Sequence, residues 1–464
     1  MINIDTSLSA AVLLPKLDQF FGLAADKIRL LDSEWDTRQG SPVFTIDGKY
    51  ATRGWTEWTQ GFQFGCALLQ FDSEDDEEFL DLGRQRTIDL MAPHLTHTGV
   101  HDHGFNNVST YGNLLRLINE GRISASEWEK RFYELAIKVS GAVQASRWTD
   151  LPDGLGYVYS FNGPHSLFAD TIRSMRAVVW SHSLGHVLQG EHDEVHNLLG
   201  RALKHAETTA RYNVYFGEGR DSYDEYGRVV HESIFNINDG QYRCPSTQQG
   251  YSPFTTWTRG QAWVLCGYPE QLEFMRDVPA SEFEALDLSI LNDKTKVIDR
   301  LRQVAVATAE HFISETPTDG IPYWDTGAPG LARLGDYQNR PAEPYNDFEP
   351  VDSSAAAISA QGLIRLGTFL ASMDDPNASR YLQAGLTVAA RLFEEPYLST
   401  DPEHHGLLLH SVYHRPNGWD NIPDGQSIPC NESTMWGDYH AMELALLIKR
   451  MASNGYHQFA SWRE

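Results

Sequence analysis

Cysteine is scarce in this chain, and no two cysteines form a recognisable pair. The four residues, Cys66, Cys244, Cys266 and Cys430, show neither a CxxC motif nor the spacing of a disulfide framework. Closely spaced cysteines are the usual sequence sign of a zinc site or of a small secreted disulfide fold. We therefore expect four free thiols in a reducing compartment.

Positive charge is also in short supply. The chain has 37 Lys and Arg against 63 Asp and Glu, which gives a formal net charge of -26 at pH 7. Non-specific binding to nucleic acid or to an anionic membrane depends on basic surface. The composition therefore argues against both kinds of partner, and an anionic ligand would need a local basic pocket.

Long apolar runs and linker-like segments are missing as well. No stretch is long enough to span a bilayer, the first residues carry no basic region, and residues 10–14 are too short for the apolar core of a secretory signal. No segment rich in Pro, Gly and Ser divides the 464 residues. We expect a cytoplasmic protein with a single domain over residues 1–464.

Aromatic residues, in contrast, are plentiful. The chain contains 12 Trp, 20 Tyr and 21 Phe, and 41% of its residues are hydrophobic. This is ample material for a large core, and the aromatic content exceeds what packing alone requires. It suggests a cavity lined by aromatic side chains.

Amphipathic helices dominate the pattern and recur in pairs. An apolar helix, a short acidic loop and a second, outwardly charged helix are predicted around residues 67–82, 188–199 and 370–382. Repeated helical hairpins stack and share one core. Because the apolar helices have two buried sides, we expect a closed toroid rather than an open solenoid. Residues 212–246 and 396–435 are predicted to form long loops or small hairpins, which in a compact domain are usually functional.

The stretch Thr247–Trp263 combines a loop with the start of a helix. Gly and Pro punctuate its first half, and the helical pattern begins near Trp257. Its indoles, the Gln249 amide and the Arg259 guanidinium suit a carbohydrate site, which needs flat apolar faces and a few fixed donors. The alternative is an ordinary helix start whose Arg259 caps a neighbouring helix.

Phe168–Ser181 is predicted to be a helix with two different faces. Positions 168, 172, 175 and 179 form an apolar stripe, whereas the opposite face carries Asp170, Arg173, Ser174 and Ala177. Such a helix is typical of the lining of a solvated cavity, with Asp170 facing that cavity. The alternative is that Asp170 only caps the helix.

His101-Asp102-His103-Gly104-Phe105 places a carboxylate between two imidazoles. The pattern could bind a metal, but no third ligand has a suitable local spacing. An ordinary turn before a helix is the simpler interpretation, and we expect no metal.

These motifs carry a resemblance to a known family. The stretch Thr247–Trp263 resembles the signature of the unsaturated glucuronyl hydrolases, glycoside hydrolase family 88, and further matches follow in the expected order over most of residues 54–440. The resemblance implies an all-α fold, an (α/α)6 toroid of helical hairpins with long site-forming loops and small β-hairpins. It also implies an enzyme that releases a 4,5-unsaturated uronic acid from the non-reducing end of oligosaccharides.

The resemblance also implies roles for individual residues. Asp170 matches the family's proton donor, and Asp102 matches the Asp that assists it. Gly54–Phe62 corresponds loosely to a motif that lines the site, and His231 matches a His that contacts sugar. The implied substrate-binding residues are His101, Phe62, Arg173, His231, Gln249, Trp257, Arg259 and Trp263.

In the implied reaction, Asp170 protonates C4 of the C4=C5 double bond and water adds to C5. No metal or organic cofactor is needed, and the partner is the oligosaccharide, bound by a monomer or a homodimer. A protonated Asp170 requires a raised pKa, which burial and the nearby Asp102 charge would supply. Trp257 or Trp263 would stack on the ring, while Arg259 and Gln249 would hold the uronate.

Arg173 departs from the family pattern, which has Met at this position. A guanidinium three residues after Asp170 either pairs with that carboxyl or points across the cavity as a second anion contact. We expect the second arrangement, because a solvated cavity gives a long side chain room to extend.

Three other functions fit a helical toroid. A polysaccharide lyase would need a Tyr or His base instead of an acid, and a sugar epimerase of this fold would work with paired His. A carbohydrate-binding toroid would have lost its acid. Whether Asp170 faces the aromatic cavity separates the hydrolase from the binding protein.

Overall fold

A computed structural model gives the structure of the chain and describes residues 1–54 and 57–462. Its helices alternate along the chain between an inner and an outer ring, as their packing partners show. The six inner segments are α2 (Gln60–Glu74), α5–α6 (His103–Asn107 and Asn113–Asn119, joined by the π-helical turn Val108–Gly112), α8 (Thr171–Ser183), α10 (Thr258–Asp277), α13 (Ser353–Ala371) and α15 (Met435–Ala452).

The outer ring covers these inner helices. Its members are α1 (Ala10–Glu34), α3 (Glu77–Leu90), α7 (Glu127–Ser146), α9 (Leu198–Tyr212), α12 (Lys294–Glu315) and α14 (Ala378–Leu392). Each inner segment packs against the next, and α15 packs back against α2, so the ring closes. The predicted (α/α)6 toroid is confirmed, and the short helices α4 (Ala92–Leu95) and α11 (Ala280–Glu284) lie in its connections.

Burial distinguishes the two rings. All of Thr258–Met275 on α10 is buried, as is most of α8, α13 and α15, whereas α9 buries one face only. A helix that is buried all round belongs inside a core, and a one-sided helix belongs at its surface. One hydrophobic cluster connects residues from Ile2 to Ala460.

Side-chain caps set where several outer helices begin. The side chains of Asp76, Ser126 and Asn197 accept backbone N–H bonds in the first turns of α3, α7 and α9. These are preferred cap residues, and they stand where the hairpin pattern places the second helix. The hairpins α2–α3 and α13–α14 form as predicted.

The segment before α9 is different from the prediction. Gly185 adopts a left-handed φ of 75° just after the end of α8. The chain then forms the antiparallel pair β6 (Leu188–Gln189) and β7 (Val195–His196) before α9 starts. Glycine adopts this conformation at no steric cost, which is why the helix does not continue.

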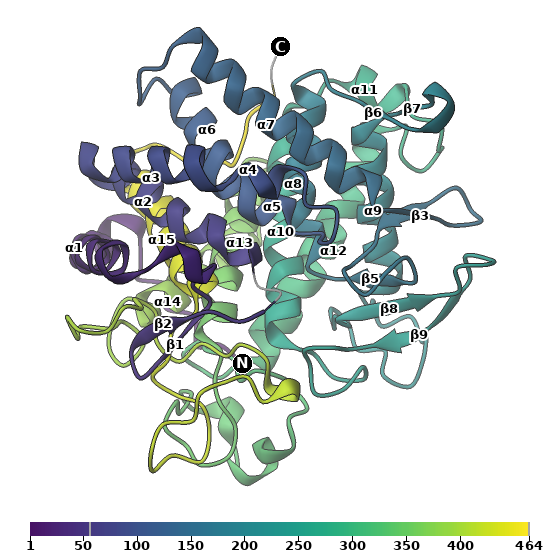
Figure 1. Cartoon of the computed structure of the whole chain (residues 1–464). Helices are drawn as coiled ribbons and strands as arrows, with labels where there is room; N and C mark the ends of the chain where they lie inside the picture. The colour runs from purple at the N-terminus through teal and green to yellow at the C-terminus, as the bar shows by residue number, and fades with distance from the viewer. Residues whose placement is uncertain (55–56, 463–464) are drawn as a thin grey trace.

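Short antiparallel strands occupy other loops (Figure 1). β1 (Phe44–Ile46) pairs with β2 (Lys49–Ala51), and β3 (Trp148–Asp150) pairs with β4 (Gly156–Val158). A three-stranded sheet has the order β5–β8–β9, with bounds Ser166–Phe168, Glu232–Phe235 and Tyr242–Ser246. Because residue 168 pairs with Glu232 in this sheet, the helix predicted to start at Phe168 begins at Thr171.

The described residues contain neither a candidate membrane span nor a candidate metal site. Residues 1–54 and 57–462 contain no helix that is both long and apolar enough to cross a membrane. In the same ranges, no three or more His, Cys, Asp and Glu side chains are grouped so that they could hold a metal ion.

Candidate active site

A cavity of about 430 Å³ opens where the inner helices begin. Asp102 immediately precedes α5, Asp170 precedes α8, and Arg259 lies in the first turn of α10. The lining residues are Trp58, His97, Gly99, Val100, His101, Asp102, Phe105, Phe161, Asp170, Gln248, Gln249, Trp257, Arg259, Trp263, Tyr413, His414, Asn417 and Trp419.

The amino ends of several inner helices therefore face one space. Each helix N-terminus carries a partial positive charge and unpaired N–H groups. Two of these helices, α8 and α10, are 13 and 20 residues long. Their dipoles favour an anion in the cavity, in spite of the net charge of -26.

Two carboxyls and an imidazole form the centre of the site. His101 Nε2 lies 3.4 Å from Asp170 Oδ1 and 3.8 Å from Asp102 Oδ1. All three side chains are buried, and neither His101 nitrogen nor Asp170 Oδ1 has a hydrogen-bond partner among the described residues. His101 Nε2 and Asp170 Oδ1 face each other, whereas His101 Nδ1 faces no partner among the described residues, which is rare for a buried polar atom.

The pKa values of the two carboxyls shift in opposite directions, although His101 lowers both of them. Burial raises the pKa of Asp102, and the Asp170 charge adds to the rise against the opposing effect of His101. Burial also acts to raise the pKa of Asp170, but contact with His101 outweighs it, so this pKa lies below its ordinary value. The expectation of a raised pKa at Asp170 is wrong, because His101 is closer to Asp170 than to Asp102.

The pKa of His101 is raised by its contacts with the two carboxyls. Burial lowers the pKa of His101, but Asp102 and Asp170 together raise it above its ordinary value. The two carboxyls and the imidazole hold their protons jointly, so a titration reports the group rather than one member.

His231 is a neutral neighbour of this group. Its Nδ1 accepts a backbone N–H bond from Gln248 at 3.1 Å, and burial lowers the pKa of His231 to about 4. Because a backbone amide can only donate, the ring proton is on Nε2. That nitrogen is buried without a hydrogen-bond partner among the described residues, and the ring packs between Phe168 and Trp257.

Arg259 lines the cavity, but partners hold most of its guanidinium. Nη1 donates to Asp352 at 2.7 Å, and Nη2 donates to the Tyr413 carbonyl at 2.6 Å and to Gln249 at 3.2 Å. Asp352 is the cap residue of α13. Arg259 thus supports a neighbouring helix cap and forms part of the cavity wall at the same time.

Comparisons with known proteins give relatives of the family that the sequence motifs resemble. No family model matches the chain. An unsaturated glucuronyl hydrolase of Bacillus sp. (strain GL1) is 25% identical over 417 residues, 88% of this chain and 91% of the relative. An unsaturated chondroitin disaccharide hydrolase of Streptococcus pyogenes serotype M1 is 23% identical over 438 residues, 93% of this chain and 90% of the relative.

The chain is a relative of the unsaturated glucuronyl hydrolases. A solved structure of the unsaturated glucuronyl hydrolase from Streptococcus agalactiae superposes with a TM-score of 0.69 and 18% identity. The superposition covers 96% of this chain and 94% of the other. At that identity the structural likeness establishes the shared fold.

Most of the residues that the hydrolase resemblance singles out meet at the cavity. Asp102, Asp170, His101, Gln249, Trp257, Arg259 and Trp263 all line it. His231 lies against Trp257 with a ring distance of 4.7 Å. These residues are far apart in the sequence, and their assembly at one site depends on the toroid.

Phe62 does not reach the cavity. It is fully buried and packs edge-on against Trp58, at 5.8 Å, and beside Phe105, at 6.0 Å. Trp58 and Phe105 line the cavity in front of it. Phe62 therefore supports the wall, and its expected substrate contact is wrong. Two residues of the same motif, Trp55 and Thr56, lie outside the described residues.

Arg173 does not reach the cavity either, although the sequence analysis expected it to contact the substrate. Its side chain is fully buried, donates to Glu270 at 3.0 Å, and forms an ion pair with Glu443 at 2.6 Å. The whole polar face of α8 is buried against other inner helices, so the guanidinium neither pairs with Asp170 nor points across the cavity. Both alternatives considered from the sequence are wrong, because partners on α10 and α15 hold Arg173.

Sequence reasoning missed one wall of the site. Tyr413, His414, Asn417 and Trp419 line the cavity from residues 396–435, which were expected to be a functional loop without any residue being singled out. Phe161 was also missed, although it stacks on His101 with ring centres 5.9 Å apart. For the wall at Tyr413, the signal in the sequence was the richness of residues 396–435 in Pro, Asn, His and Gly.

Proposed function

We propose that the chain is a glycoside hydrolase that releases a 4,5-unsaturated uronic acid from the non-reducing end of an oligosaccharide. The observation that carries the proposal is the group of Asp102, His101 and Asp170 at an aromatic cavity, with 3.4 Å between His101 and Asp170. The names of the relatives support the substrate class.

The proposed chemistry is hydration of a vinyl ether. A proton from Asp170 adds to C4, the double-bond electrons form the new C–H bond, and an oxocarbenium ion develops at C5. Water adds at C5, and its proton returns to Asp170. The resulting hemiketal opens and expels the aglycone, so the anomeric carbon is not attacked directly.

Substrate binding would place the proton on Asp170. A uronate carboxylate bound nearby adds a like charge and displaces water, and both effects raise the pKa of a buried acid. Burial raises the pKa of Asp102, which lies 3.8 Å from the same His101 that contacts Asp170. In this proposal Asp102 assists, and His101 contacts the substrate.

Binding of the uronate follows from the amino ends of the helices and the cavity wall. The converging helix dipoles attract the carboxylate. The Nε2–H of His231 is a fixed donor without a partner among the described residues. Trp257 and Trp263 line the cavity and offer faces for the ring, and Trp419 and Asn417 line another part of the same cavity.

Several expectations from the sequence stay predictions within this proposal. They are a single domain over residues 1–464, a cytoplasmic location, a monomer or homodimer, and a reaction without metal or organic cofactor. The roles of the individual site residues belong with them.

The test is an assay of unsaturated disaccharides prepared from several polysaccharides. We expect the ultraviolet absorbance of the conjugated double bond to fall as the second sugar is released, and saturated disaccharides to stay intact. A rise in absorbance on an intact polysaccharide would indicate a lyase, and binding without turnover would indicate a carbohydrate-binding protein.

A further inference from the structure

Three carboxylates outside the Asp102–Asp170 pair bind the backbone of the loops that frame the cavity. We name Asp325, Asp420 and Asp438 the clamp carboxylates. Asp325 and Asp438 are buried, and Asp420 is partly buried. None of them lines the cavity itself, so none can touch a substrate there.

Asp325 holds the loop that precedes α10. Its carboxylate accepts N–H bonds from Tyr251 at 2.8 Å and from Gly327 at 2.9 Å. Tyr251 follows Gln248 and Gln249, which line the cavity. Residue 325 also forms a β-bridge with Trp257, so Asp325 fixes both ends of this loop.

Asp420 holds the opposite wall. Its carboxylate accepts the backbone N–H bonds of Tyr413 and His414, the second at 3.2 Å. Both of these residues line the cavity, together with Trp419 next to Asp420. The carboxylate therefore closes the short loop that carries this wall.

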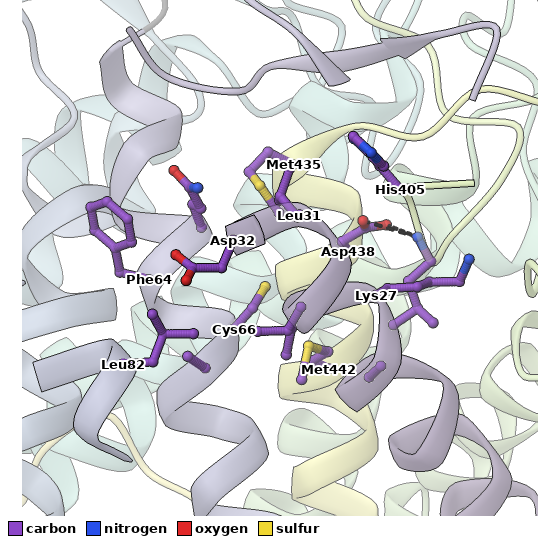
Figure 2. A pocket seen from close by; sticks show the side chains of 15 residues that line it. Lys27, Leu31, Asp32, Phe64, Cys66, Leu82, His405, Met435, Asp438 and Met442 are labelled. Atoms are coloured by element: carbon purple, nitrogen blue, oxygen red, sulfur yellow. Dashed lines mark hydrogen bonds between the residues drawn. The ribbon is translucent and has the colours of Figure 1, made fainter. Parts of the chain in front are cut away.

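Asp438 ties three elements together at the start of α15. It accepts N–H bonds from Leu407 at 3.0 Å and Leu408 at 2.8 Å, and the hydroxyl bond of Tyr50 on β2 at 2.7 Å. Figure 2 shows Asp438 at a small cavity of about 40 Å³ between α1 and α15, with Lys27 and His405 beside it. Leu407 and Leu408 begin the segment that leads to the cavity wall at Tyr413.

We propose that the clamp carboxylates are positioning residues, which hold the binding walls at a fixed distance from Asp102 and Asp170 and so determine substrate affinity. The kinetic part of this inference rests on the proposed function. The backbone contacts stand independently of it.

Two of the clamp carboxylates, Asp325 and Asp438, are buried groups that carry a negative charge at neutral pH. Burial raises the pKa of Asp325 and of Asp438 to about 6 each. A carboxyl whose pKa is higher in the folded than in the unfolded state stabilises the fold at low pH, and that contribution is lost as pH rises through about 6. At neutral pH both groups are therefore ionised at a cost to stability, which favours a positioning role over a stabilising one.

Other charged and titratable groups face these two carboxylates. Glu349 faces Asp325, and its charge adds to the rise in pKa. Around Asp438 they are Lys27, which lowers its pKa, and Tyr50, Cys66 and His405. A protonated carboxyl gives up an acceptor position, so acid loosens the clamp bonds.

The test compares Asp325→Asn and Asp438→Asn with a matched control, Asp319→Asn. Asp319 is also a largely buried carboxyl with a raised pKa, and it accepts backbone N–H bonds from Ile321 and Ala342, which do not line the cavity. We expect the two clamp variants to raise KM about tenfold with little change in kcat, the size of effect expected when charge-assisted hydrogen bonds are lost. The control variant should match the wild type.

The variant Asp325→Glu distinguishes an effect of the position of the carboxylate from an effect of its charge. It keeps the carboxylate but moves it by one methylene, so a positioning role predicts a raised KM here too. For the wild type we expect KM to rise as pH falls below about 6, and this acid limb should become shallower in Asp325→Asn while the part due to Asp438 remains. A KM equal to that of the control in all three clamp variants would overturn the proposal.

Hydrogen exchange tests the clamps without an activity assay. We expect the Tyr251 and Gly327 amides to lose protection in Asp325→Asn, and the Leu407 and Leu408 amides to lose it in Asp438→Asn. If the wild type cleaves no unsaturated disaccharide, the proposed function fails while the exchange data still test the clamps. Unchanged protection in both variants would refute the clamps themselves.

Discussion

At the scale of single residues, the proton balance between Asp102, His101 and Asp170 determines the chemistry. We expect Asp170→Asn and Asp102→Asn each to lower kcat by about a hundredfold or more, the usual contribution of a positioned acid or base. Both variants should fold, because an amide replaces a carboxyl of the same size. Steady-state kinetics and circular dichroism check this.

Asp81→Asn is the control for this pair, because Asp81 is exposed on the outer helix α3. It should keep full activity. Near-normal turnover by Asp170→Asn would remove Asp170 from the proposed mechanism.

Arg173 supports the fold rather than the substrate. Arg173→Met leaves Glu270 and Glu443 as buried carboxylates without their main partner. Breaking a buried ion pair in this way costs about 3–5 kcal/mol of unfolding free energy. Urea denaturation should show the loss, and Arg173→Lys should lose less because it keeps the charge but not the planar fork.

A selective loss of affinity for charged substrates in Arg173→Met, at unchanged stability, would contradict this role. Such a result would place the guanidinium at the cavity, where the sequence alone had suggested it.

At the scale of elements, the loop that carries Trp419 forms a wall of the cavity without belonging to the core. Trp419 is partly exposed and packs on Tyr413 and His414, with ring centres 5.3 Å and 5.0 Å away. Trp419→Ala should raise KM about three- to tenfold, the effect of one lost aromatic contact. Its melting temperature should stay near that of the wild type, whereas Trp263→Ala, in the core, should lower it.

A fall in stability of Trp419→Ala as large as that of Trp263→Ala would assign Trp419 to the core. Unchanged KM in a folded Trp419→Ala would remove this loop from the binding site.

The inner and outer helices could be predicted because the pattern of apolar and charged residues within each helix indicates which of its faces are buried. The hairpin around Asp75 and Asp76 carries its acidic cap, and α10 begins next to Trp257 as expected. The start of α8 could not be predicted, because Phe168 pairs with a strand 64 residues later along the chain. The β6–β7 hairpin was missed for a related reason, since Gly185 ends α8 by its conformation alone.

At the scale of the whole molecule, buried charge pairs link distant helices. Asp72 binds Arg116 and Arg450, and these charges outweigh burial and lower its pKa to about 2. A carboxyl with a depressed pKa in the folded state stabilises the fold above its unfolded pKa, and this stability is lost as pH falls through about 2. The shift from 3.8 corresponds to about 2 kcal/mol.

Asp72→Asn should therefore be less stable than the wild type at pH 7, and the difference should shrink as pH falls from about 4 towards 2. Thermal unfolding as a function of pH measures this. A difference that stays constant over that range would show that Asp72 does not act through its charge.

The candidate site could be predicted only in part, since the toroid creates it from separate segments. Asp102, Asp170 and Trp257 were found because each lies next to a helix start in a motif that resembles one of the hydrolase family. The burial of Arg173 could not be seen, because its partners Glu270 and Glu443 are 97 and 270 residues away in the sequence. The wall at Trp419 could not be predicted either, because it is far in the sequence from the motifs at Asp102, Asp170 and Trp257.

The most direct test of the account is hydrolysis of an unsaturated disaccharide in D2O, followed by nuclear magnetic resonance at C4 of the released uronate. Protonation of C4 by Asp170 predicts that one solvent deuteron appears at C4, and that the double-bond absorbance disappears at the rate of aglycone release. An aglycone released with the double bond intact and no deuterium at C4 would mean direct attack at the anomeric carbon, and would contradict the account.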